Sequence, residues 1–117
     1  MPKSSVFNVR TLLPLDDARQ IIEVARNRAR ERGFSPLTLV VLDAGGNTVA
    51  LEREDGCGIA REPVARAKAW GALGFGIASR TIGERNVGRD AFLAAAAAAT
   101  GGQFVAVPGG VLILKDG

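Results

Sequence analysis

The sequence predicts a mixed α/β (α+β) domain in which helices cover both sides of a mainly antiparallel sheet. Two observations indicate this fold class. Leu37 to Asp43 has apolar residues on both faces of a strand, which is typical of a strand that is covered on both sides. Helical spacing before and after the strands, with two short apolar segments near the C-terminus, gives the element order α-ββ-α-α-ββ.

The hairpin is the most clearly marked part of this order. Strands are predicted at Leu37–Ala44 and Thr48–Glu54, because the alternation of side chains is broken only at Gly45 and Gly46. Adjacent glycines between two alternating apolar segments favour a tight turn. We therefore expect these two segments to pair as antiparallel neighbours.

Three helices are predicted around the hairpin. The first is capped by Asp16 or Asp17 and closed by Gly33, and the second runs from about Glu62 to Gly76. The third helix follows a capping aspartate and is largely alanine, which favours close packing against another helix. Residues 81–87 are expected to form a short helical or irregular link, and residues 104–107 and 111–114 to form short strands.

Composition excludes several classes of function. The 117 residues are enough for one domain, residues 1–117, and contain no histidine and no tyrosine, which excludes a His-ligated metal site and a Ser-His-Asp triad. No apolar run approaches the roughly 18 residues of a spanning helix, and no signal peptide is recognisable, so we expect a cytoplasmic protein without a membrane partner. Alternate arginines favour a solvated helix face over a nucleic-acid patch: Arg26, Arg28, Arg30 and Arg32.

Lys68 is the strongest candidate for a catalytic or ligand-binding residue. Its neighbours three and four positions away on the second helix are small and apolar: Val64, Ala65, Gly71 and Ala72. Two interpretations stay open. The ammonium group can snorkel to water along this face. Alternatively, it reaches a pocket and meets an anionic ligand or a carboxylate, where a depressed pKa would suit it to acid/base work.

Charged residues at the end of the hairpin are the candidate partners of Lys68. Asp43 and Arg53 lie at the ends of apolar stripes on their strands, and Asp55 follows Arg53 by two residues. The charged end of the hairpin is therefore either a solvated rim or the edge of a pocket. Pro108-Gly109-Gly110 beside Phe104 is a second candidate, because adjacent glycines let a ligand approach the main chain. A plain loop is the alternative there. Cys57 lies between two glycines, and its sequence context favours a small packing residue over a reactive thiol.

Three blocks of the sequence carry a family signature in this order: VVLDAGGNTVALEREDG, ARAKAWGAL and GGQFVAVPGGVLI. From about Leu15 to the last residue, the chain resembles the GlcG/HbpS-like family, also described as the haem-degrading or PduO C-terminal-type domain. The resemblance implies a profilin-like three-layer α/β/α domain with a five-stranded antiparallel sheet, usually oligomeric, and an association with haem or corrinoid. The motif positions of the family map onto Asp43, Gly46, Arg53, Asp55, Gly56, Lys68, Pro108, Gly109 and Gly110.

Two departures from the family pattern bear on these expectations. Relatives usually continue past K-D-G into another strand and a final helix, which we expect to be missing here. The segment Val111–Leu114 would then be an unpaired apolar edge, and we expect a homo-oligomer to cover it. Without histidine or tyrosine, only Cys57, Met1, Lys68, a hydroxyl or water could hold haem iron, whereas propionates could pair with Arg53 or Lys68.

Three functions fit the sequence: a ligand-binding module without turnover, an enzyme acting on a small carboxylate, and an oligomeric accessory protein. In the enzyme, Lys68 would be the acid/base and Arg53 the carboxylate clamp. We expect the binding module, with a pocket for a small anion, haem or another tetrapyrrole in some relatives, and with no metal site or nucleic-acid partner. The expected ligand-binding residues are Asp43, Arg53, Asp55, Lys68, Phe104, Pro108, Gly109 and Gly110.

Overall fold

The structure of the protein is a computed structural model that describes residues 5–116. Within that range it contains four helices and two strands, which confirms the mixed α/β fold class. Along the chain they are α1 (Leu15–Glu31), β1 (Thr38–Leu42), β2 (Thr48–Arg53), α2 (Arg61–Phe75), α3 (Ser79–Arg85) and α4 (Asp90–Ala99).

The two strands pair antiparallel as predicted, with Val40 opposite Leu51. Their turn is closed by Asp43, whose backbone N–H donates to the Asn47 carbonyl at 2.9 Å. The Asp43 carboxylate also accepts hydrogen bonds from the backbone N–H groups of Gly45 and Asn47 at 2.9 and 3.0 Å. Gly46 has a φ of +78° and lies under the Trp70 ring, so the turn requires glycine at this position.

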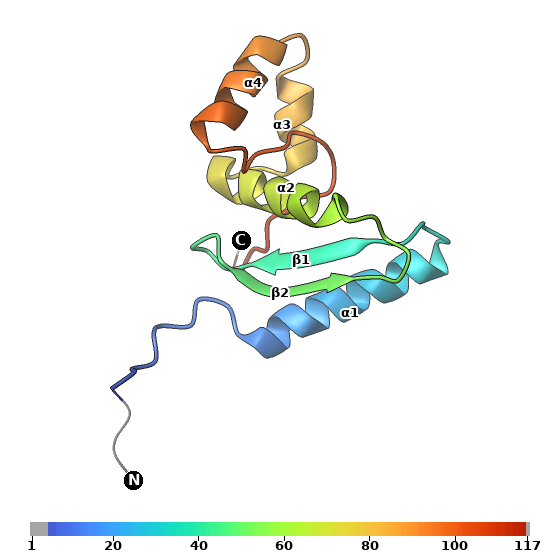
Figure 1. Cartoon of the computed structure of the whole chain (residues 1–117), viewed down its shortest axis with the longest axis vertical. Helices are drawn as coiled ribbons and strands as arrows, with labels where there is room; N and C mark the ends of the chain where they lie inside the picture. Colours follow the sequence, from blue (N-terminus) through green and yellow to red (C-terminus); the bar gives the residue numbers. More distant parts are fainter. Residues whose placement is uncertain (1–4, 117) are drawn as a thin grey trace.

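The hairpin lies between two helices, which gives the three layers of an α/β/α arrangement (Figure 1). Against the α1 face, Ala18, Ile22 and Val41 form a buried cluster. On the other face, α2 packs over β1. The strand whose residues are apolar on both faces is therefore covered on both sides, as its sequence predicts.

The predicted helices are present, but their N-terminal caps differ from the prediction. Pro14 is the N-cap of α1, and Asp16 and Asp17 lie in the first turn instead. There they still complement the positive end of the helix dipole. The expected link after Gly76 contains the short helix α3. None of the helices within residues 5–116 is long and apolar enough to span a membrane.

The C-terminal region contradicts two predictions. Residues 104–107 and 111–114 form no strands, so the described residues supply two of the five strands that the family resemblance implies. Phe104 is instead buried against Gly71, with its ring 5.0 Å from that of Phe75. Packing onto helices, rather than a neighbouring strand, thus holds this segment. Helix α4 has no buried residue, so the close packing expected of its alanines is wrong as well.

Candidate functional site

A cavity of about 630 Å³ lies along β1, between this strand, α2 and the C-terminal segment. Its volume is within the range of roughly 300–1,000 Å³ that is common for small-molecule sites. The walls are mainly apolar. They include Val64, Ala69 and Leu73 from α2, and Val111 and Leu112 from the C-terminal segment.

Lys68 lies in the wall of this cavity, beside the Pro108-Gly109-Gly110 loop. A Cβ atom on Gly109 would be 3.4 Å from Lys68 Nζ, so the ammonium group lies next to the loop backbone. A Cβ atom on Gly110 would be 2.2 Å from the Lys68 carbonyl oxygen, and only glycine permits this approach of loop and helix. The side chain is half-buried and makes no hydrogen bond or ion pair with any described residue.

The glycine loop is fastened by Ser79, a fully buried residue at the start of α3. Its Oγ donates to the Val107 carbonyl at 2.6 Å and accepts from the Gly110 N–H at 2.8 Å. The Ser79 backbone N–H donates to the Gly110 carbonyl at 2.9 Å. Ser79 thus positions the loop beside Lys68. Sequence reasoning missed this residue, since nothing local distinguishes a serine that is buried by a distant loop.

Two more cations, Arg61 and Lys115, line the same cavity and form no ion pair within residues 5–116. Arg61 was missed from the sequence although a signal existed, because it precedes Lys68 by seven residues, which is two helical turns on the same face. Lys115 follows the apolar C-terminal segment without any periodic signal. Asp43 also lines the cavity, but its carboxylate is engaged by the hairpin turn.

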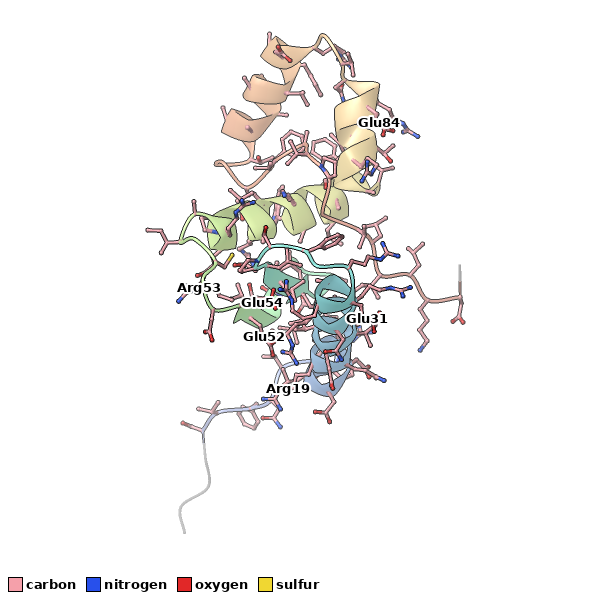
Figure 2. All side chains as sticks on the ribbon, turned by 90° about the vertical axis from the view of Figure 1, so that its right-hand side faces the viewer. Arg19, Glu31, Glu52, Arg53, Glu54 and Glu84 are labelled. Atoms are coloured by element: carbon pink, nitrogen blue, oxygen red, sulfur yellow. The ribbon has the colours of Figure 1, made fainter. Side chains whose placement is uncertain are left out.

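Arg53 and Asp55 do not border this cavity, contrary to the prediction that both belong to the site of Lys68. They line a smaller depression at the end of β2, together with Glu52 and Glu54. Figure 2 labels Glu52, Arg53 and Glu54, whose side chains lie near one another. The Arg53 guanidinium donates to the Cys57 carbonyl at 3.0 Å. Because β1 is the strand beside the cavity and β2 lies behind it, residues at the end of β2 face a different part of the surface. Phe104 is buried against α2 and does not line the cavity.

Charges around the smaller depression pair with each other. Arg26 forms an ion pair with Glu52, and Arg30 forms one with Glu54 at 3.1 Å. Glu54 also accepts the Leu37 N–H at 2.8 Å. These arginines of α1 therefore have partners inside the protein, which agrees with a solvated, ion-paired helix face.

Arg66 of α2 contacts the hairpin turn. Its guanidinium donates to the Thr48 hydroxyl and to the Gly46 carbonyl, the latter at 2.9 Å. This contact fastens α2 to the turn and holds the helix that carries Lys68.

The donor set of the cavity suits carboxylates better than iron. Its cationic side chains match propionate groups of the kind that haem carries. Cys57 is buried, with its Sγ 3.2 Å from Thr38 Oγ1, and it does not line the cavity. The described residues contain no group of three or more His, Cys, Asp or Glu side chains that could hold a metal ion.

Solved structures share this fold at low sequence identity. A double mutant of HbpS from Streptomyces reticuli has a TM-score of 0.74 and 21% identity, over 100% of this chain and 75% of that one. A further HbpS structure has a TM-score of 0.73 and 21% identity, over 98% and 77% of the two chains. Protein ORFY from Klebsiella pneumoniae has a TM-score of 0.72 and 18% identity, over 99% and 78%. No curated protein sequence matches the chain.

A family match supports the same relationship over most of the sequence. Residues 13–117 match the family described as haem degrading protein HbpS-like. This range contains the hairpin, α2 with Lys68 and the glycine loop, which are the three blocks that carry the resemblance. The chain belongs to the HbpS-like family.

Proposed function

We propose that this protein binds a small anionic molecule with an apolar body in the Lys68 cavity, and that haem or another tetrapyrrole is the ligand class. One observation carries the proposal. Lys68, Arg61 and Lys115 line a mainly apolar cavity without an ion-pair partner among residues 5–116. The Lys68 ammonium group has no partner among the described residues and lies beside the cavity, so a ligand carboxylate could form a charge-assisted hydrogen bond with it. The family description points to haem independently.

Recognition in this proposal depends on the ligand's carboxylates and apolar ring, and iron gains no strong axial ligand. The cavity contributes no histidine, tyrosine or cysteine. We therefore expect haemin to bind without a sharp, low-spin Soret spectrum. Such a spectrum, abolished by Cys57→Ala or Lys68→Ala, would contradict this expectation.

The experiment compares haemin with metal-free protoporphyrin IX, followed by quenching of the single tryptophan, Trp70. Lys68→Met removes the charge and keeps much of the apolar stem. It should weaken both probes about tenfold or more, because a hydrogen bond to a charged group contributes roughly 1.5–3 kcal/mol. Arg53→Met is the matched control, since it removes a cation outside the cavity and should leave both affinities unchanged. Equal affinities of wild type and Lys68→Met would reject the proposal.

We also propose that the protein is a homo-oligomer, as the sequence predicts. Helix α4 supports this, because it is rich in apolar residues and yet none of its residues is buried, and Phe92 is 42% exposed. Exposed apolar helix faces commonly mark protein interfaces. Light scattering at working concentration should give a multiple of the chain mass, and a clean monomer mass would contradict the proposal.

A further inference from the structure

The depression at the end of β2 has a volume of about 380 Å³ and carries as many cations as anions. This volume is within the range that is common for small-molecule sites. Pro36 is its one uncharged lining residue, and three arginines and three acids form the rest: Arg26, Arg30, Arg53, Glu52, Glu54 and Asp55. None of the six charged residues lines the Lys68 cavity. The lining therefore has no net charge, and it favours neither a simple anion nor a simple cation.

Two of these six charges have no partner within the described part of the chain. The two arginines of α1 pair with Glu52 and Glu54. Arg53 and Asp55 form no ion pair within residues 5–116, neither with each other nor with another residue. Because an ion pair requires a nitrogen and an oxygen within about 4 Å, their charged groups lie further apart than that. The depression thus keeps one cation and one anion that are held apart.

Arg53 is positioned by the backbone of the adjacent loop. One N–H group of its guanidinium donates to the Cys57 carbonyl at 3.0 Å, across the turn of residues 54–57. A guanidinium has five N–H donors, and no other acceptor contacts this one within residues 5–116. The remaining donors are available to a carboxylate, which matches the planar guanidinium in geometry and in charge.

Asp55 lies in the same turn, on its exposed side. The turn is closed by the Cys57 N–H, which donates to the Glu54 carbonyl at 3.1 Å, and Gly56 has a φ of +85°. A Cβ atom on Gly56 would be 3.5 Å from Pro36 Cγ, so the turn packs against the proline ring. An ionised carboxylate only accepts hydrogen bonds, so Asp55 suits an ammonium group. The proline ring and the methylene stems of the arginines supply an apolar surface beside it.

We propose that this depression is a second ligand site, which binds a free α-amino acid with a short apolar side chain. The ligand's carboxylate accepts hydrogen bonds from Arg53, its ammonium group donates to Asp55, and its side chain lies against Pro36. A zwitterion complements the lining because it brings one charge of each sign and no net charge. The site shares no charged residue with the Lys68 cavity, so it does not depend on tetrapyrrole binding.

Three related ligands test which charges the site recognises: L-valine, L-valinamide and N-acetyl-L-valine. Each is titrated into the full ¹⁵N-labelled chain without haemin, and the backbone amide signals of Gly56 and Cys57 report binding. Valinamide lacks the carboxylate, and acetylvaline lacks the ammonium group. Each should therefore bind at least tenfold more weakly than valine, because it loses one of the two charge-assisted contacts.

Protein variants test the two contacts separately. Arg53→Gln and Asp55→Asn should each weaken valine binding at least tenfold. Arg80→Gln and Glu84→Gln are the matched controls, since they remove exposed charges of α3, far from the depression (Figure 2). Both controls should leave the valine affinity unchanged. Lys68→Met should also leave it unchanged, which separates this site from the Lys68 cavity.

Three outcomes would overturn the proposal. The first is that valine at millimolar concentration shifts no amide signal of the depression. The second is that valinamide or acetylvaline binds as tightly as valine, and the third is that Arg53→Gln or Asp55→Asn binds valine as the wild type does. If circular dichroism shows that Arg53→Gln does not fold, the comparison of the three ligands on the wild-type chain gives the deciding result.

Discussion

The two charged regions of this molecule use similar residues in opposite ways. At the end of β2, Arg26 and Arg30 pair with Glu52 and Glu54, and Glu54 also accepts a backbone N–H. Along β1, Lys68 and its neighbouring cations line an apolar cavity with no such partners in the described range. The first arrangement satisfies its charges internally and so contributes to the fold. The second leaves charge available, which is what a binding site for an anion requires.

This contrast makes a general point about candidate sites. A cluster of charged residues in sequence, such as Glu52 to Asp55, attracts attention because its members are adjacent. In the structure, most of that cluster is engaged in ion pairs and hydrogen bonds of its own. The candidate for anion binding is instead a cation whose sequence neighbours are apolar. Substitutions should therefore separate the two regions by their effects on stability and on binding.

The largest expected effect lies where the glycine loop meets α2. Gly110→Ala places a methyl group 2.2 Å from the Lys68 carbonyl oxygen, so the loop must move away from the helix. Overpacking of this kind should lower the free energy of unfolding by about 3 kcal/mol. Urea denaturation measures it. Gly58→Ala is the control, because no atom lies within 4 Å of the added group, and an equal loss in both variants would contradict the argument.

In the ion-paired region, Glu54→Gln should have the next largest effect. The Glu54 side chain is 14% exposed and accepts hydrogen bonds from the Leu37 N–H and from Arg30. Loss of its charge should lower the free energy of unfolding by about 2 kcal/mol. Asp55→Asn alters an exposed neighbour in the same depression and should change stability by less than about 0.5 kcal/mol. If both changes had the same effect, Glu54 would not be the anchor of this region.

A smaller effect is expected for the exposed pair of Arg26 and Glu52, whose side chains are 37% and 45% exposed. Solvent screening limits such pairs to roughly 0.2–1 kcal/mol. A double-mutant cycle with Arg26→Ala and Glu52→Ala should give a coupling energy in this range that disappears in 1 M salt. A coupling above this range, or one that persists in 1 M salt, would show that the pair is shielded from solvent.

The smallest effect on stability should come from Lys68→Met, the same change that weakens ligand binding. No described residue loses an ion pair, so the free energy of unfolding should stay within about 0.5 kcal/mol of the wild-type value. Urea denaturation without ligand gives the answer. A loss above about 1 kcal/mol would mean that Lys68 has a structural partner, and the contrast between the two regions would fail.

Local patterns in the sequence predicted the hairpin and the helices, because their causes are local, whereas the strands predicted at residues 104–107 and 111–114 are absent. The glycines at 45 and 46 marked the turn, and the small apolar neighbours of Lys68 placed it on a packed face of α2. The prediction that Arg53 borders the cavity was wrong because the position of the cavity depends on long-range packing. Alternation assigns a side chain to a face of its strand, but it does not state which edge of the hairpin borders a cavity.

Two further residues show the same limit. Phe104 precedes a glycine loop, and its burial against Gly71 depends on how the chain returns to α2 from residues far along the sequence. Ser79 acquires its role only from that same return. In contrast, Arg61 has a purely helical relation to Lys68 and was within reach of periodicity alone. The sequence could predict that Arg61 and Lys68 lie on one face of α2. It could not predict which residues the Pro108-Gly109-Gly110 loop brings together.

Helix α4 has a consequence for the internal motions of the protein. A helix of ten residues is marginal by itself, and α4 has no buried residue to tie its opening to the rest of the fold. Its amide protons should therefore exchange with solvent by local fraying, at rates that low concentrations of denaturant barely change. Amides of α2, and the β1 amides that donate to β2, should exchange only when the whole hairpin layer opens. The chain would thus have a fast-exchanging helix joined to a slow-exchanging centre, and a partner bound to α4 would appear as protection confined to residues 90–99.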